Sequence, residues 1–317
     1  MAEQASCQGD FITVVGAVNM DISGTAFEPL IMGDSNPGRV SLSLGGVGRN
    51  IADNLSRLGA PVRLVTVLGE DVYGYQAEKN CRELHIDLSL SQRIPGETTS
   101  TYLCINEPDG DVKLAVSAMD ICRHISPAFL LGRMEEINRS GVVVMDANLS
   151  EEAIAFLAEN CTAPLFADPV SVKKAARLKE HLRNVYCVKP NRPEAEVLSG
   201  VSIPDHGDLP KAAESLHKKG VKLVFISLGG EGVYYDDGRE QGILPCCLGR
   251  IENTTGCGDA FMAAASFGYY LGKPPKDMAI MGLAAAALCA GAKGAIREDM
   301  THQLLVHKIR EFGGESI

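Results

Sequence analysis

The second half of the chain alternates short apolar runs with amphipathic segments. The predicted strands are 141–145, 164–167, 185–188 and 223–227. The segments between and after them repeat apolar residues with a helical period and are predicted as helices at 151–160, 175–182, 194–199 and 211–219. Buried strands that alternate with helices are typical of a parallel sheet covered on both faces. The pattern therefore predicts an α/β fold with a doubly wound, mainly parallel sheet flanked by helices.

The first third has a different pattern, in which polar and apolar residues alternate with the two-residue period of a strand. After a buried strand at 11–17, this alternation places Asn19 and Asp21 on the same side. The segments 23–44 and 98–117 are also expected to be strands. Together they predict a small antiparallel β-sheet, apart from the main sheet, that closes over a substrate as a lid.

A glycine-rich stretch at 253–259 precedes a run of helix formers predicted at 260–271. Its glycines, Gly256 and Gly258, free backbone N–H groups to point one way at a helix N-terminus, where the helix dipole favours an anion. Asp259 stands about one turn further on. A carboxylate there would repel a bound phosphate, so a site that only binds phosphate would avoid it, whereas a phosphoryl-transfer enzyme needs it to accept the proton of the substrate hydroxyl. The stretch therefore indicates phosphoryl transfer. The alternative is a glycine-rich turn in which Asp259 stabilises the first helical turn by about 0.3–1 kcal/mol.

Polar residues also follow the predicted strands. The carboxyl ends of parallel strands meet at one edge of a sheet, where ligands bind. The residues expected along this edge are Asp146, Asn148, Asp168, Asn191, Glu194 and Ser227. A second glycine cluster, at 45–50, opens a predicted helix at 51–58 and lets a ligand approach the backbone. It lacks the Lys-Ser/Thr pair of a Walker A loop and does not match the fingerprint of a dinucleotide-binding loop.

Composition limits the possible partners. The 317 residues carry a net charge of −10 without a long basic run, which argues against binding to nucleic acid. The ten cysteines are scattered without the spacing of a zinc site, and we expect reduced thiols. No signal-peptide pattern is present, and the longest apolar run, 279–292, is too short to span a bilayer. We expect a cytoplasmic protein with no membrane partner, with a disordered tail at 1–10 and a single domain at 11–317.

Three motifs together resemble the ribokinase-type (phosphofructokinase-B) family of sugar and nucleoside kinases. They are Gly45-Gly-x-Gly-x-Asn50, Lys189-Pro-Asn-x-x-Glu194 with Ser227-x-Gly-x-x-Gly232, and Thr254-Thr-Gly-Cys-Gly-Asp259. They occur in the order that the family has, and the resemblance covers about residues 10–310. It implies a ribokinase-like fold and an ATP- and Mg²⁺-dependent phosphotransferase with an alcohol acceptor.

The resemblance also implies a role for each matching residue. Asp259 would accept the proton of the sugar 5′-hydroxyl, and the backbone amides of Gly256, Cys257 and Gly258 would hold the transferring phosphoryl group. Asn191 and Glu194 would organise Mg²⁺. The expected nucleotide contacts are Lys189, Asn191, Ser227, Gly229, Gly232 and Thr254. The expected substrate contacts are Asn19, Asp21, Gly45, Gly46, Asn50, Thr101, Asp120 and Asn148.

The chain departs from the family pattern at two positions. Asn253 stands where the family often has an acid that helps to hold a monovalent cation, which makes activation by K⁺ doubtful. Cys257 stands where the family usually has alanine, and a thiol at a helix N-terminus has a lowered pKa. We therefore expect alkylating or oxidising agents to inactivate the enzyme and ATP to protect it.

Several segments resemble the members of the family that act on pseudouridine and imply phosphorylation of its 5′-hydroxyl. These segments are 34–38, 45–52, 119–121, 168–171 and 189–192. Two alternatives stay open. One is a kinase for another nucleoside or a sugar, and the other is an inactive kinase-like protein that binds a metabolite and signals through a partner. Apolar positions and edges of the lid further suggest that two protomers pair as a homodimer through the lid.

Overall fold

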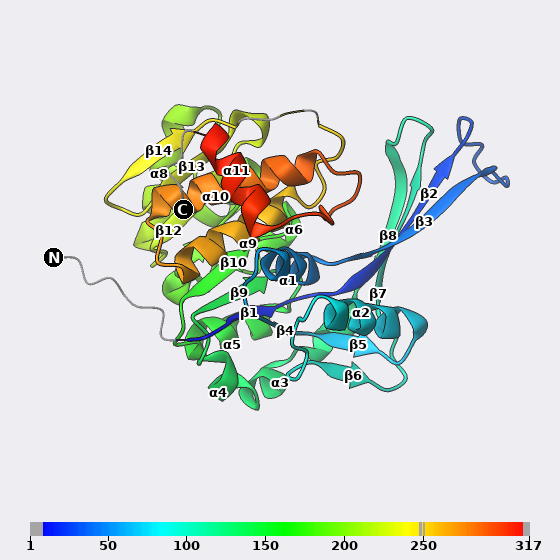
Figure 1. The fold of residues 1–317 in the computed structure, drawn as a ribbon, viewed down its shortest axis with the longest axis horizontal. Coiled ribbons are helices and arrows are strands. Elements are labelled where there is room, and N and C mark those ends of the chain that lie inside the picture. The colour runs from blue at the N-terminus through cyan, green and yellow to red at the C-terminus, as the bar shows by residue number, and fades with distance from the viewer. Residues whose placement is uncertain (1–8, 247–248, 250, 313–317) are drawn as a thin grey trace.

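The computed structural model describes residues 9–246, 249 and 251–312. The predicted tail therefore lies outside the described residues up to residue 8. Figure 1 shows a large body built around a central sheet, from which a smaller sheet projects. Within the described ranges, none of the helices has both the length and the apolar character that crossing a bilayer requires.

The central sheet has eight strands in the order β14-β13-β12-β11-β10-β9-β1-β4. Its strands are β1 (Ile12–Val15), β4 (Val62–Val65), β9 (Val142–Asp146), β10 (Leu165–Asp168), β11 (Cys187–Val188), β12 (Leu223–Ser227), β13 (Val233–Asp236) and β14 (Gln241–Leu244). The pairings from β4 through β12 are parallel, whereas β13 and β14 add an antiparallel edge. The predicted mainly parallel sheet is thus confirmed.

Helices cover both faces of this sheet, as its apolar strands require. One face carries α1 (Val47–Arg57), α2 (Val72–Glu83), α9 (Cys257–Tyr270), α10 (Pro275–Ala290) and α11 (His302–Glu311). The other carries α3 (Pro127–Leu131), α4 (Met134–Ile137), α5 (Glu151–Asn160), α6 (Val172–Ala175), α7 (Arg192–Ser199) and α8 (Leu209–Lys218). Alternate residues of one strand serve the two cores, since Val144 belongs to the first and Val143 to the second.

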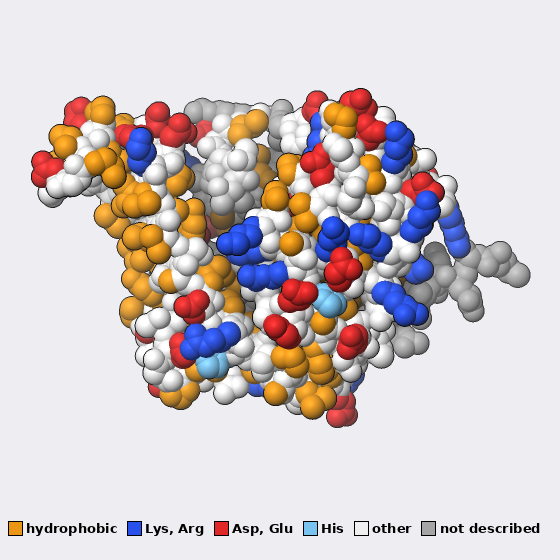
Figure 2. Space-filling model, turned by 180° about the vertical axis from the view of Figure 1, so that it is seen from behind, with side chains coloured by type: hydrophobic (Ala, Val, Ile, Leu, Met, Phe, Trp, Pro, Cys, Tyr) orange, Lys and Arg blue, Asp and Glu red, His pale blue; other side chains and the backbone are white. Residues whose placement is uncertain are grey.

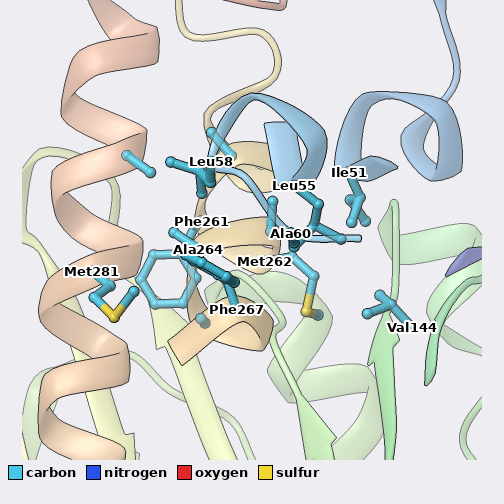
Figure 3. Close-up of a cluster of buried hydrophobic side chains, with 14 of the residues drawn as sticks. Ile51, Leu55, Leu58, Ala60, Val144, Phe261, Met262, Ala264, Phe267 and Met281 are labelled. Carbon is cyan, nitrogen blue, oxygen red and sulfur yellow. The ribbon is translucent and has the colours of Figure 1, made fainter. Parts of the chain in front are cut away.

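The first core holds α1 and α9 together above β9. Ile51 and Leu55 from α1, Met262 from α9 and Val144 from β9 gather in one apolar cluster (Figure 3). All four are fully buried, so their packing is dense and resists a change of shape. It therefore fixes the N-terminal turns of α1 and α9 relative to each other.

The smaller sheet, which we call the lid, has the strand order β3-β2-β7-β8 and projects to one side (Figure 1). Its strands are β2 (Asn19–Ala26), β3 (Gly38–Gly45), β7 (Ser100–Asn106) and β8 (Val112–Ala118). The pairings β2–β3 and β7–β8 are antiparallel, as predicted, and β2 and β7 pair in parallel at the centre. A separate two-stranded sheet joins β5 (Val67–Gly69) and β6 (Gln92–Ile94).

The lid has one polar and one apolar face. The strand register places Asn19 and Asp21 on the same face as Ser43. It places Leu42 on the opposite face together with Val116. The apolar face is uncovered in the single chain, since Leu42 is 53% and Val116 is 55% exposed.

One local prediction is wrong, and one hairpin was not predicted. The helix predicted at 175–182 does not form, because α6 ends at Ala175 and the following N–H groups donate to carbonyls only three residues back. The apolar pattern there is still satisfied, since Leu178 and Leu182 are buried. The hairpin of β13 and β14 was not predicted, because β14 is short and alternates exposed with half-buried residues.

Candidate active site

The glycine-rich stretch forms the start of α9. Gly256 is its N-cap residue and has a φ of 82°, a left-handed conformation that glycine adopts without strain. A Cβ atom at this position would lie 2.0 Å from the carbonyl oxygen of Ala295, so a side chain is sterically excluded. The amide of Cys257 donates to the carbonyl oxygen of Thr254 over 3.3 Å. The structure therefore places Gly256, Cys257 and Gly258 in one turn at a helix N-terminus, as predicted for an anion site.

Asp259 lies in the same turn and faces α1. Asn50 Nδ2 donates a hydrogen bond to Asp259 Oδ2 over 2.8 Å. Burial raises the pKa of Asp259 to about 8, and the nearby carboxylate of Asp168 adds to this rise. The hydrogen bond from Asn50 and the positive charge of Lys189 act in the opposite direction. A carboxylate whose pKa is close to neutral pH is well suited to accept a proton from a hydroxyl group.

Arg49 sets the orientation of the Asn50 side chain. Its Nη1 donates to Asn50 Oδ1 over 3.2 Å, which leaves the amide nitrogen to face Asp259. Because a guanidinium group only donates hydrogen bonds, the oxygen of Asn50 must be the atom that faces it. Arg49 is buried, and its Nη2 donates to Asp53 and Asn80. Arg49 was not predicted as a site residue, because its only signal in the sequence is a charge inside the second glycine motif.

Lys189 follows β11 and reaches the first turn of α9. Its Nζ lies 3.1 Å from Asp168 Oδ2, and both residues are buried. A Cβ atom at Gly258 would lie 2.9 Å from the same Nζ, so glycine allows this close approach. Burial alone would lower the pKa of Lys189, but the carboxylates of Asp168 and Asp259 raise it. A permanent positive charge therefore stands beside the predicted anion site.

The residues predicted for Mg²⁺ form the beginning of α7. Asn191 Oδ1 accepts from the Glu194 amide over 3.0 Å, and Glu194 Oε2 accepts from the Asn191 amide over 2.9 Å. Burial raises the pKa of Glu194. Together the pair forms a capping box, which holds the Glu194 carboxylate in place.

These residues suit Mg²⁺ held largely through water and phosphate. Across the part of the chain that the structure describes, no group of three or more His, Cys, Asp or Glu residues could hold a metal alone. Glu194 offers carboxylate oxygens, and the carboxylate of Asp168 is buried beside Lys189 Nζ. Mg²⁺ prefers oxygen ligands and usually keeps several waters beside one or two carboxylates and the phosphates of its substrate.

A cavity of about 270 Å³ lies beside the first turn of α9. Its lining includes the predicted nucleotide contacts Lys189, Ser227, Gly229, Gly232 and Thr254, together with Cys257 and Gly258. Leu283, Ala286 and Ala290 of α10 give it an apolar wall. Asn191 is the remaining predicted contact and forms a bridge with Ser227. An apolar wall and a few converging polar groups are typical of a small-molecule site.

The residues predicted to hold the sugar gather where β2 leaves the body. Asn19 Nδ2 donates to Asp21 Oδ1 over 2.5 Å. Burial raises the pKa of Asp21 to about 6. Gly45 allows the Asp21 carboxylate to approach the backbone, since a Cβ atom there would lie 2.2 Å from Oδ2. Gly46 has a φ of 96° at the N-cap of α1, which brings the turn that holds Asn50 next to these residues.

The other predicted substrate contacts are distributed over two places. Asp120 and Asn148 line one hollow of about 400 Å³. Thr101 instead pairs with Met20 and points to the apolar face of the lid, away from Asn19. Lys174 was not predicted to lie here. Its Nζ donates a hydrogen bond to Asn148 Oδ1, and burial lowers its pKa. No sequence signal distinguishes Lys174 from its neighbouring lysine.

Asp146, which was expected at the ligand edge of the sheet, accepts hydrogen bonds from three backbone amides. Its Oδ2 accepts from the amides of Ala17 over 2.9 Å and Gly48 over 2.7 Å. Its Oδ1 accepts from the amide of Asn148 over 2.8 Å. Asp146 therefore ties the segment between β1 and β2 to the first turn of α1.

The side chain of Asn253 is engaged at both ends. Its Nδ2 donates to the carbonyl oxygen of Lys293 over 3.2 Å, and its Oδ1 accepts from the amide of Thr255 over 2.9 Å. An aspartate here could not donate to that carbonyl group.

Comparison with known proteins gives three further findings. Residues 10–302 match the model of the pfkB family of carbohydrate kinases. The chain is 38% identical over 269 residues to pseudouridine kinase of Escherichia coli K12, which covers 84% of this chain and 85% of that protein. It is 36% identical over 284 residues to the uncharacterized sugar kinase YeiI of the same strain, covering 88% and 78%.

Among solved structures, Arabidopsis thaliana ribokinase complexed with ribose and ATP matches with a TM-score of 0.85, and the match covers 95% of this chain and 99% of that chain. The two sequences are 22% identical, so this likeness shows a shared fold.

Proposed function

Because the chain belongs to the pfkB family of carbohydrate kinases, we propose that it transfers the γ-phosphoryl group of ATP to the 5′-hydroxyl of pseudouridine. The expected family is confirmed, and a sugar or nucleoside kinase of this family is a phosphotransferase with an alcohol acceptor. The relative that acts on pseudouridine supports the substrate. The observation that carries the proposal is the cavity of predicted nucleotide contacts beside the hydrogen-bonded pair of Asp259 and Asn50.

In the proposed reaction, Asp259 accepts the proton of the 5′-hydroxyl while the hydroxyl oxygen bonds to the γ-phosphorus. The bond from this phosphorus to the β,γ-bridging oxygen breaks, and ADP leaves. Negative charge on the phosphoryl oxygens is stabilised by N–H groups at the start of α9. Lys189, whose ammonium group lies beside Gly258, adds positive charge at the same place. Mg²⁺, held near Asn191 and Glu194, would neutralise charge on the phosphates of ATP. Proton transfer can follow phosphoryl transfer in a loose transition state, so the raised pKa of Asp259 is compatible with this role.

The substrate would lie between the lid and α1. Asp21 and Asn19 on the polar face of the lid offer hydrogen bonds to ribose hydroxyl groups, and Asn50 offers another from α1. The base of pseudouridine is attached through carbon and therefore keeps an N–H group that uridine lacks. A hydrogen-bond acceptor placed at this N–H group discriminates strongly between the two nucleosides. Asp120 and Asn148, which share one hollow, are the acceptors that we propose.

ADP release should be measured with pseudouridine, uridine, cytidine, adenosine, inosine, ribose and fructose 6-phosphate. We expect turnover with pseudouridine alone, a 5′-phosphate as the product, and loss of turnover in Asp259→Asn. An Asn148→Ala variant should lose preference for pseudouridine over uridine, whereas Asn138→Ala, a surface asparagine bonded to the backbone of residue 160, should keep it. Turnover confined to another compound would refute the substrate. The similarity to YeiI keeps another sugar or nucleoside as the second candidate.

We also propose that the apolar face of the lid pairs with the same face of a second copy. Its residues Val40, Leu42, Leu103, Leu114 and Val116 are 39–66% exposed. Figure 2 shows hydrophobic side chains running along the projecting part of the molecule. A two-fold pairing would cover this face, with a gain of about 25 cal/mol for each Å² of apolar surface buried.

Light scattering should therefore give the mass of two chains at micromolar concentration. Val116→Lys should produce monomers, whereas Lys113→Ala, which changes a neighbouring residue of the same strand, should not. A wild-type monomer with full activity would contradict the proposal.

A further inference from the structure

The first residue of α9 and the end of α10 bring two cysteines together. The two helices lie side by side in the first core (Figure 1). Cys257 begins α9 and lines the nucleotide cavity, where its side chain is partly exposed. Cys289 is buried near the end of α10, and its Sγ lies 3.4 Å from the Ala295 carbonyl oxygen and 3.8 Å from that of Thr255. Cys257 Sγ lies 4.0 Å from the carbonyl oxygen of Asn253, in the same turn whose Thr255 carbonyl oxygen faces Cys289 Sγ, so both thiols lie at this turn.

The two thiols differ in acidity. The neighbouring thiol of Cys289 lowers the pKa of Cys257, with help from the backbone amide of Cys257 and the charge of Lys189, whereas burial acts in the opposite direction. The neighbouring Cys257 and burial raise the pKa of Cys289. Cys257 is thus the partly exposed nucleophile, since the thiolate is the reactive form, and Cys289 is the buried thiol at the same turn.

We propose that Cys257 and Cys289 form an oxidation site at which a hydroperoxide produces a disulfide bond. In the first step, Cys257 sulfur attacks a peroxide oxygen, the O–O bond breaks, and hydrogen peroxide leaves one water and a sulfenic acid. In the second, Cys289 sulfur attacks Cys257 sulfur, the S–O bond breaks, and a second water leaves. Two thiols are oxidised and one peroxide is reduced, with no other reactant.

The disulfide would close the nucleotide cavity at the end where phosphate is expected. The Cys257 side chain lines the cavity together with Thr254 and Gly258. A covalent bond to Cys289 would pull the first residue of α9 toward α10, and Gly256 beside it has no free space because it packs against Ala295. This consequence rests on the proposed binding of ATP, whereas formation of the disulfide does not. Bound ATP should in turn shield Cys257.

The reduced protein should be treated with hydrogen peroxide, with and without ATP and Mg²⁺, and then digested without reductant. We expect one peptide pair linked through Cys257 and Cys289, a mass loss of about 2 Da, and reversal by dithiothreitol. In Cys289→Ser, the sulfenic acid at Cys257 should persist and be trapped by dimedone. If that variant does not fold, Cys257→Ala gives the same test, because it should lose the linked peptide pair and form no other disulfide.

Cys161 provides a matched control. It is also partly exposed, but burial raises its pKa to about 11. Cys161→Ser should therefore form the disulfide at the wild-type rate. Linkage of other cysteines, or a sulfonic acid at Cys257 without any linkage to Cys289, would overturn the proposal. Because these readouts are masses, they hold even if pseudouridine is not the substrate; protection by ATP, measured by mass, tests the nucleotide site separately.

Discussion

The hydrogen bond from Asn50 to Asp259 should set the pH range in which the enzyme works. With a pKa of about 8, Asp259 is about one-tenth deprotonated at pH 7 and about nine-tenths at pH 9. Because kcat/KM reports the ionisation of the free enzyme, its logarithm should rise by about one for each pH unit below pH 8 and level off above.

Substitution Asn50→Ala removes a donor that favours the charged form of Asp259. A hydrogen bond to a charged group contributes about 1.5–3 kcal/mol, which corresponds to about one to two pKa units. The acidic limb should therefore move upward by that amount. At pH 7, kcat/KM should fall by about 10–100-fold in addition to any loss of substrate contact, which lowers activity equally at all pH values.

The assay is release of ADP from about pH 6 to about pH 10, with the substrate far below KM. Asn80→Ala is the matched control, since Asn80 also contacts Arg49 but does not contact Asp259. Its acidic limb should stay near pH 8. A uniform loss across the whole pH range in Asn50→Ala, with an unmoved limb, would refute the reasoning. It would mean that Asn50 acts only on the substrate.

Three further predictions concern stability and geometry. Asp259→Asn should lower kcat by about 10²–10⁴-fold. The folded pKa of Asp259, about 8, lies above its unfolded value, so the wild type loses stability as the pH rises between the two values. Asp259→Asn removes this loss. In urea unfolding, the variant should therefore be more stable than the wild type by at most about 6 kcal/mol at pH 9 and by less at pH 5. Lys189→Met should lower the free energy of unfolding by about 3–5 kcal/mol, because it leaves Asp168 unpaired in the interior. The double variant with Asp168→Asn should recover most of this loss, and additive losses would contradict the pairing. Gly256→Ala should lower the free energy of unfolding by about 1–3 kcal/mol and abolish activity, because φ is 82° at this position and the added Cβ would clash with backbone. Gly132→Ala has open space around it and should leave the melting temperature unchanged. Equal melting temperatures for the two variants would refute the steric argument.

Local rules were enough to predict much of the fold and many of the residues that gather around the cavity beside α9. Strands of the central sheet are short and apolar because both faces are covered, and this produces a strong pattern. Gly256 was recognisable because a left-handed residue at a helix N-cap almost requires glycine. The predicted nucleotide contacts came together because strand ends of a parallel sheet share one edge.

Contacts between distant side chains were beyond reach of the sequence. Arg49 orients Asn50 only because Asn80 and Asp53 hold its other nitrogen, and Cys289 meets Cys257 only because α10 packs along α9. The helix predicted at 175–182 failed for a related reason. The spacing of apolar residues indicates which residues are buried but does not distinguish an α-helix from tighter turns. Here, turns with hydrogen bonds between residues i and i+3 bury the same residues.

The lid also has a consequence for how the molecule folds and opens. Within the described residues its strands pair only with one another, and its central pairing joins Asn19 to Ser100, which are far apart along the chain. Forming that pair requires closure of a long loop, so the lid should assemble after the central sheet has brought β1 into place. It should likewise be a separate cooperative unit in hydrogen exchange, with amides that exchange through local opening rather than through global unfolding. Part of the substrate's binding energy would then be used to order this unit, which links affinity to the local stability of the lid.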